Sequence, residues 1–223
     1  MNVFVFLQEV TLSPEVLDQL VFRMGVVPLR HAVALREAPL NLGAWLVPML
    51  SAMFLHGGWA HLIGNMVYLW IFGDGLENRL GHLRFMVFYL VAGMVAAQAQ
   101  VLANPLSAVP MIGASGAIAG VMGAYVLLYP HARITLMVPI FFFPFFFDIS
   151  VIVFGLFWFG QQLMLGTFGA LTQASGQAGG VAWWAHAGGF LGGAVLLPLL
   201  LDRKHQGHRP PRYDDPRSAW RPY

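Results

Sequence analysis

Residues 113 to 129 read GASGAIAGVMGAYVLLY, a segment that carries no charged side chain and is rich in glycine and alanine. A helix over this segment places Gly116 and Gly120 on one face, in the Gly-x-x-x-Gly spacing that lets two helix backbones approach closely in a membrane. Gly189 and Gly193 repeat this spacing in an apolar segment near the C-terminus. We therefore expect these two segments to form helices that pack closely together.

The composition of the whole chain places it in a lipid bilayer. Of its 223 residues, 58% are hydrophobic and 10% are charged, whereas a soluble domain is usually about 25% charged. The chain contains no cysteine, which excludes disulfides, a thiolate nucleophile and cysteine-ligated metals. Its basic residues gather at the ends of apolar segments, so we expect lipid and no nucleic acid as a partner.

The apolar segments predict an all-α, polytopic bundle of about six transmembrane helices. This membrane domain covers residues 1–201, and a Pro- and Arg-rich cytoplasmic tail, residues 202–223, is predicted to be disordered. Residues 3–7 are apolar but too short to cross a bilayer, so we expect a first spanning helix that begins upstream of Met1 and is truncated here. The other predicted spans cover residues 59–79, 83–102, 113–129, 148–165 and 182–201.

Four connections between these spans carry their own predictions. Ser13-Pro14 predicts the start of an amphipathic helix that ends near Met24. Prolines and glycines predict a long structured loop over residues 25–48. The apolar residues 134–147 contain two prolines, which favours a re-entrant or interfacial segment. Residues 166–180 are uncharged and rich in glycine, which predicts a flexible loop.

The distribution of basic residues predicts the orientation of the chain. The connections over residues 103–112 and 166–182 contain no Lys or Arg, as expected of translocated loops under the positive-inside rule. Both termini are then cytoplasmic, and we expect a bacterial inner membrane. Nine of the twelve basic residues lie on the cytoplasmic side in this arrangement: Arg79, Arg84, Arg133, Arg203, Lys204, Arg209, Arg212, Arg217 and Arg221.

Four polar residues inside the predicted spans suggest a chemical function, because such groups are costly in hydrocarbon. His61 and Asn65 are four residues apart and share one helix face. Ser115 lies in the first turn of its helix, and His186 lies at the same end of the last span. A serine becomes a nucleophile when a base accepts its proton, and backbone N–H groups at a helix N-terminus can stabilise an oxyanion.

Acidic residues lie too far from these four side chains to join them. Asp74 and Glu77 follow His61 on one helix by roughly 20 Å or more, and Asp148 lies at the cytoplasmic end. The sequence therefore predicts a Ser/His dyad without cofactor or metal. A zinc site formed by His56, His61 and His186 is the alternative, although the sequence contains no His-Glu-x-x-His motif.

Three motifs in order resemble the rhomboid family of intramembrane serine proteases. The similarity covers about residues 25–201 and rests on three segments: HGGWAHLIGN at 56–65, GASG at 113–116 and AHAGG at 185–189, together with GDGLENRLG at 73–81. The resemblance implies a six-helix fold in which Ser115 is the nucleophile and His186 is the general base and acid. It also implies an oxyanion hole formed by His61, Asn65 and the backbone N–H of Ser115.

The resemblance also implies supporting roles and a class of substrate. Transmembrane segments of other proteins would be cut near the translocated surface. The helix over 148–165 and the loop over 166–180 would act as gate and cap, and the loop over 25–48 would lie partly in the outer leaflet. The residues expected to support the site are His56, Gly113, Gly116, Gly189 and the pair Glu77 and Arg79 at the cytoplasmic end.

One position departs from the family pattern. Some members carry an aromatic residue four positions after the serine, and it stacks on the catalytic histidine. Here that position is Ala119, so the orientation of His186 needs another source. Two other classes of function stay open: a non-catalytic, client-binding membrane scaffold, and a small-solute transporter, for which the expected pair of interrupted spans is missing.

Overall fold

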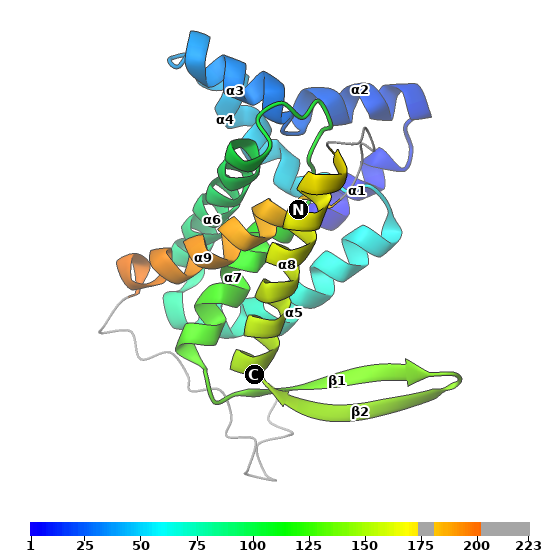
Figure 1. Ribbon diagram of the computed structural model, residues 1–223, viewed down its shortest axis with the longest axis vertical. Coiled ribbons are helices and arrows are strands. Elements are labelled where there is room, and N and C mark those ends of the chain that lie inside the picture. The colour runs from blue at the N-terminus through cyan, green and yellow to red at the C-terminus, as the bar shows by residue number, and fades with distance from the viewer. Residues whose placement is uncertain (174–180, 202–223) are drawn as a thin grey trace.

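The protein forms a helical bundle with one projecting β-hairpin (Figure 1). The computed structural model describes residues 1–173 and 181–201. The predicted disorder of residues 202–223 therefore lies outside the described residues. The elements are α1 (Asn2–Glu9), α2 (Pro14–Met24), α3 (Pro28–Glu37), α4 (Leu42–Ser51), η1 (Ala52–Phe54), α5 (Trp59–Leu80), α6 (His82–Ala103), α7 (Ser115–Leu128), β1 (Arg133–Ile140), β2 (Phe143–Ser150), α8 (Val151–Gln173) and α9 (Trp183–Leu200).

Helix α7 is the centre of the bundle. It contacts α5, α6, α8 and α9, and every residue from Ala117 to Ala124 is buried. A helix that is apolar on all sides belongs in a protein core or in a membrane, and here the other helices cover it. The quoted segment 113–129 therefore forms the innermost helix, around which the other helices are arranged (Figure 1).

Glycines allow α7 and α9 to meet backbone to backbone, as the sequence predicts. A Cβ atom built on Gly193 would overlap the backbone of Gly120, and one built on Gly189 would overlap the carbonyl group of Gly116. A Cβ on Gly116 would also lie 2.7 Å from the Cβ of Ala96 in α6. These positions exclude any side chain, so the small residues determine the distance between the helices.

The lengths of the helices support a membrane-embedded bundle. Within residues 1–173 and 181–201, three helical segments are long and apolar enough to cross a membrane: His82–Ala103, Val151–Gly169 and Trp183–Leu200. A fourth candidate combines residues 42–54 with 59–80, which are bent by 88° at the break between them. Helix α7 has 14 residues and α1 has 8, so the number of six spanning helices stays a prediction.

The N-terminal region is more helical than the sequence predicts. Helix α2 agrees with the expected boundaries, and the Ser13 side chain accepts a hydrogen bond from the N–H of Val16 at 3.4 Å. The loop predicted over residues 25–48 instead contains α3 and most of α4. Pro28 occupies the start of α3, where a proline favours a helix because the missing N–H would have had no partner there.

The connection predicted as a re-entrant or interfacial segment is an antiparallel β-hairpin. Strands β1 and β2 pair from Arg133 opposite Ser150 to Ile140 opposite Phe143. Phe141 takes a positive φ of 54° in the turn. The segment is rich in β-branched and aromatic residues, which favour strands, so its prolines do not prevent regular structure. The chain is therefore mostly helical, as predicted, but the prediction of an all-α fold did not include this hairpin.

Helix α8 is longer than predicted. It begins after β2 and extends through Gln173, whereas the sequence predicts an end near Leu165 and a flexible loop from Gly166. Gly166 packs in the helix against Trp184, because a Cβ there would lie 3.1 Å from that ring. The loop prediction is therefore wrong for residues 166–173, and its remaining residues, 174–180, lie outside the described part of the chain.

The backbone contact between α7 and α9 yields a test of stability. We expect Gly193→Ala to destabilise the protein by about 1 to 3 kcal/mol, because the added methyl group must push α9 away from Gly120. The measurement is thermal unfolding in detergent.

The matched control is Gly64→Ala in α5, since no described atom lies within 4 Å of a Cβ at Gly64. That variant should match or exceed the wild-type stability, because alanine favours helix. Equal unfolding temperatures for Gly193→Ala and wild type would contradict the close packing.

Candidate active site

A glycine turn places Ser115 at the start of the central helix. Gly113 has a φ of +121°, a conformation that side-chain-bearing residues rarely adopt, and its N–H donates to the carbonyl of Ala52 at 2.8 Å. A Cβ on Gly113 would lie 2.7 Å from the imidazole of His61. The turn therefore requires glycine for its backbone angle and for the neighbouring ring, and Ser115 is the first residue of α7.

The close packing of α7 on α9 brings Ser115 and His186 into direct contact. The Oγ atom of Ser115 lies 2.7 Å from Nε2 of His186. His186 lies in the first turn of α9, and Ser115 lies in the first turn of α7, so the two helices present their N-terminal ends to the same point. The two residues are 71 positions apart in the sequence.

Gln162 of α8 determines which nitrogen of His186 carries the proton. The Gln162 side-chain nitrogen donates to the carbonyl of Trp158 at 3.2 Å. Its Oε1 therefore faces Nδ1 of His186, at 2.9 Å. Because an amide oxygen only accepts, Nδ1 must be the protonated nitrogen. Nε2 then has a free lone pair directed at the hydroxyl group of Ser115.

Two tryptophans surround His186 where the family pattern suggests an aromatic residue at position 119. The ring of Trp158 in α8 lies 5.8 Å from the imidazole centroid, tilted by 37°, and the ring of Trp183 lies 6.2 Å away at 83°. Ala119 is itself buried in the core. His186 is thus oriented by Gln162 and by rings from α8 and α9.

His61 and Asn65 lie together beside Gly113, as their spacing on α5 predicts. Nδ1 of His61 accepts a long hydrogen bond from the N–H of Gly57 at 3.4 Å, which leaves the Nε2 proton of the neutral ring free to donate. Asn65 is buried, and its Nδ2 has no hydrogen-bond partner among the described residues. A Cβ on Gly113 would be 3.7 Å from that atom. Two side-chain donors therefore lie next to the turn that precedes Ser115.

The N-terminus of α7 adds backbone donors to this region. The first N–H groups of a helix have no partner within the helix, and the helix dipole is positive at this end. The residue that precedes Ser115 is Ala114, whose side chain has no oxygen with which to cap them. The arrangement favours a negative charge close to Ser115.

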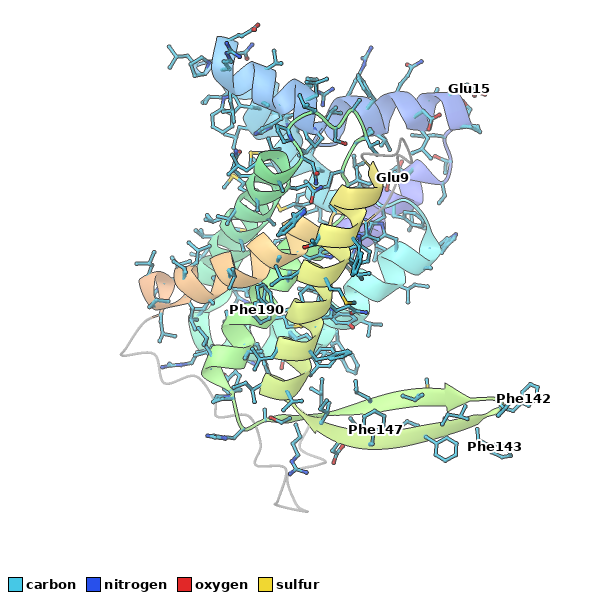
Figure 2. All side chains as sticks on the ribbon, in the orientation of Figure 1. Glu9, Glu15, Phe142, Phe143, Phe147 and Phe190 are labelled. Atoms are coloured by element: carbon cyan, nitrogen blue, oxygen red, sulfur yellow. The ribbon has the colours of Figure 1, made fainter. Side chains whose placement is uncertain are left out.

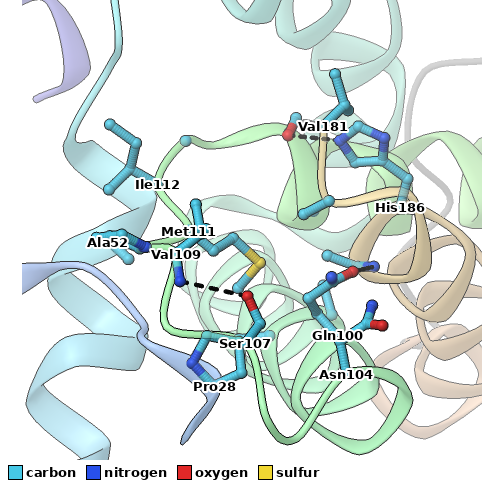
Figure 3. A pocket seen from close by; sticks show the side chains of 18 of the residues that line it. Pro28, Ala52, Gln100, Asn104, Ser107, Val109, Met111, Ile112, Val181 and His186 are labelled. Carbon is cyan, nitrogen blue, oxygen red and sulfur yellow. Dashed lines mark hydrogen bonds between the residues drawn. The ribbon is translucent and has the colours of Figure 1, made fainter. Parts of the chain in front are cut away.

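A cavity of about 1090 Å³ opens beside the Ser115 and His186 pair. Its wall includes His61, Ser115 and His186, and the connection from Asn104 to Gly113 forms one side. Figure 3 shows His186 at the edge of this cavity, with Gln100 and Ser107 also in its wall. The cavity is large enough to take several residues of an extended peptide.

His56 braces the loop before α5 and lies close to an acid. Its backbone N–H lies 3.2 Å and 3.3 Å from the two carboxylate oxygens of Glu9, and its Nδ1 donates to the carbonyl of Phe54 at 3.2 Å. The sequence analysis missed this buried carboxylate. No group of three or more His, Cys, Asp or Glu side chains within residues 1–173 and 181–201 is arranged to hold a metal ion.

The remaining predicted support residues lie in two places. Gly116, which follows Ser115 in α7, and Gly189 of α9 lie at the contact between these two helices. Glu77 lies at the opposite end of α5, where its Oε1 is 2.5 Å from Nδ1 of His82. Arg79 lies in the last turn of that helix. The predicted pairing of Glu77 with Arg79 stays a prediction.

Gln162 is the residue that sequence reasoning missed at this site. It is 3% exposed, and it is a strongly polar side chain inside a candidate membrane span. That same signal identified His61, Asn65, Ser115 and His186, so Gln162 could have been included on equal terms. Its position opposite His186 depends on the packing of α8 against α9, which the sequence motifs do not describe.

Comparison with known proteins gives a consistent family. A family model described as the Rhomboid domain matches residues 44–203. RHOMBOID-like protein 5 of Arabidopsis thaliana is 29% identical over 175 residues, which cover 75% of this chain and 48% of that protein. Rhomboid protease GluP of Bacillus subtilis is 42% identical over 81 residues, which cover 36% of this chain and 15% of that protein.

A mitochondrial relative shows the same similarity in a longer chain. The presenilin-associated rhomboid-like protein of Rattus norvegicus is 32% identical over 129 residues, or 56% of this chain and 34% of that protein. The chain spans about half the length of the plant relative and smaller shares of the other two. Together with the apolar helices, the matches identify an integral membrane protein. Because the Rhomboid model matches residues 44 to 203, most of the chain, the protein belongs to the rhomboid family.

Proposed function

We propose that this protein is an intramembrane serine endopeptidase that hydrolyses peptide bonds in or next to transmembrane segments of substrate proteins. The observation that carries the proposal is the 2.7 Å contact between Ser115 Oγ and His186 Nε2 at the edge of a large cavity. A helix-packing serine alone would need no imidazole at its hydroxyl group. The relative named Rhomboid protease GluP supports the reaction class.

His186 acts as the general base in the first half of the reaction. As Ser115 Oγ attacks the carbonyl carbon of the scissile bond, its proton moves to Nε2 of His186. The imidazolium that forms is stabilised because its Nδ1–H donates to Gln162 Oε1. A neutral amide gives less stabilisation than a carboxylate would, and it carries no charge that must be buried in the membrane.

The carbonyl oxygen becomes an oxyanion, for which His61 Nε2, Asn65 Nδ2 and the backbone N–H of Ser115 are the proposed donors. The unpaired Nδ2 of Asn65 supports this role, because a buried donor without a partner is costly unless a ligand uses it. Collapse of this intermediate breaks the C–N bond, and the proton on His186 Nε2 passes to the leaving amine. Water then attacks the Ser115 ester and gives a proton to His186 Nε2, and this proton passes to Ser115 Oγ as the acyl–oxygen bond breaks.

The geometry also bears on the substrate. A helical segment has its carbonyl groups in intrahelical hydrogen bonds, so it must unwind before one of them can reach Ser115. The cavity wall supplies many small or apolar residues and few charges, which fits an apolar chain in extended form. We propose transmembrane proteins as substrates, entry past α8, and a bacterial inner membrane with both termini in the cytoplasm.

The first test compares cleavage of a transmembrane-segment substrate by wild type, Ser115→Ala and His186→Ala in detergent or liposomes. We expect each substitution to lower kcat by at least about 10³-fold, because the nucleophile and its base act as a unit. Chelators should leave the wild-type rate unchanged.

Ser150→Ala is the matched control, because Ser150 bonds to the carbonyl of Pro130 at the base of the hairpin, away from the cavity. That variant should keep wild-type activity. Cleavage that survives Ser115→Ala would refute the proposed nucleophile, and a folded wild type that cleaves no substrate would favour the client-binding scaffold.

The second test concerns Gln162 as a positioning residue. We expect Gln162→Met to lower kcat by about 10- to 100-fold, the value of a lost hydrogen bond to a charged group, while KM changes little. Gln162→Glu keeps an acceptor oxygen and should recover much of kcat. Steady-state kinetics on one substrate give both constants.

The neighbouring Gln161 provides the control, because it is exposed on the same helix. Gln161→Met should have wild-type kinetics. If Gln162→Met keeps the wild-type kcat, then Gln162 does not position His186.

A further inference from the structure

The β-hairpin carries two of the three most exposed large apolar side chains in the described part of the chain. Residues 136–147 read LMVPIFFFPFFF and contain no polar side chain. At the turn, Phe141 is 93% exposed and Phe142 is 96% exposed. Figure 2 shows Phe142 and Phe143 at the far end of the hairpin, beyond the helices. A water-soluble surface rarely tolerates such a cluster, so it indicates a partner.

The pairing register divides the hairpin into two different faces. Side chains alternate between the faces of a strand, and directly opposed residues share a face. Near the base, Arg133, Thr135, Asp148 and Ser150 therefore lie on one face, where Thr135 Oγ1 donates to the Asp148 carboxylate at 2.6 Å. Farther out, the same face carries the apolar residues Met137 and Phe146. The opposite face is entirely apolar and consists of Ile134, Leu136, Val138, Ile140, Phe143, Phe145, Phe147 and Ile149.

The apolar face is continuous with the core of the bundle. Ile134, near the base of this face, packs against the hydrophobic core cluster that includes Leu76 and Met122. Farther along the same face, Val138, Phe145 and Phe143 are 38%, 53% and 71% exposed. The face thus begins on the helices and extends outward without a change in character. The outer part of this face extends past the helices. Around a membrane-embedded bundle, the apolar medium at that position is lipid.

The position of the hairpin in the fold also brings it next to lipid. It connects α7 to α8, and its first and last residues, Arg133 and Ser150, follow and precede these two helices. Figure 1 shows the hairpin extending sideways from the start of α8. Its charged residues, Arg133 and Asp148, are restricted to the base, where headgroups and water are accessible.

We propose that the apolar part of this hairpin, residues 136–147, lies at the surface of one leaflet beside the bundle as a lateral anchor, with its apolar side chains in the lipid and its unpaired strand edges within reach of headgroups and water. From Leu136 to Ile140 the strands extend by about 13 Å, which carries the turn beyond the helices and into the surrounding leaflet (Figure 1). The apolar face contacts acyl chains, and Arg133 and Asp148, at the base of the other face, lie at the headgroups.

Two prolines favour lipid over another protein chain as the occupant. Pro139 pairs with Pro144 near the turn, and neither residue has a backbone N–H. This removes donors that would be costly to bury in lipid, and it also interrupts the hydrogen bonds that an added strand from a second copy would need. The hairpin is thus poorly suited to edge-to-edge pairing and well suited to a non-directional apolar partner.

The absence of cysteine in the sequence allows a clean labelling experiment. The variant Phe142→Cys is labelled with the environment-sensitive fluorophore NBD and reconstituted in liposomes. The NBD emission is measured with and without doxyl-labelled lipids, which quench a fluorophore in contact with acyl chains. We expect blue-shifted emission and quenching by doxyl groups comparable to that of the same label at Phe157→Cys, an α8 position that is 72% exposed. Thr135→Cys, on the polar face of the hairpin base, should be quenched several-fold less.

Phe142 and Phe157 are both exposed, so a label at either position leaves the core intact. A change in emission therefore reports the surroundings of the label and not unfolding. Emission at position 142 that equals emission in water and is quenched by iodide would overturn the proposal. Energy transfer between labels on two copies that persists on dilution with lipid, without doxyl quenching, would overturn it in favour of a contact between copies. The readout does not depend on proteolytic activity.

Discussion

The contact between the backbones of α7 and α9 is the constraint on which the rest of the structure depends. Glycines at Gly120 and Gly193 leave no space for a side chain between the helices. Because both helices begin at the same end of the contact, their first turns meet, and Ser115 reaches His186. A larger separation would preserve each helix but break the hydrogen bond. The packing of the two helices in the core therefore determines the distance between the two reacting side chains at the cavity.

A third helix completes the site through a neutral hydrogen bond. Gln162 of α8 accepts from Nδ1 of His186, and Trp158 on the same helix contacts the ring. A charged carboxylate at this buried position would carry a large desolvation cost, which an amide avoids. The geometry also makes the orientation of His186 sensitive to the position of α8, the helix past which we propose that substrates enter.

The sequence predicts the parts of this protein that depend on local pattern and composition. Apolar length and glycine spacing predict α6, α7 and α9 closely, and the positions of Ser115 and His186 follow from those helices. The hairpin was missed because prolines suggested a break, whereas cross-strand pairing of aromatic and branched residues outweighs them. Gln162 and Glu9 were missed because their partners are distant in sequence, and only tertiary packing shows which polar groups meet.

The central claim is that packing of α7 on α9 creates one activated serine. The most direct measurement is the site of attachment of a fluorophosphonate, read by mass spectrometry on the folded protein. Our account predicts an adduct on Ser115 that is lost in His186→Ala and reduced in Gly193→Ala. Absence of an adduct on Ser115 in the folded wild type, or equal labelling in His186→Ala, would contradict it.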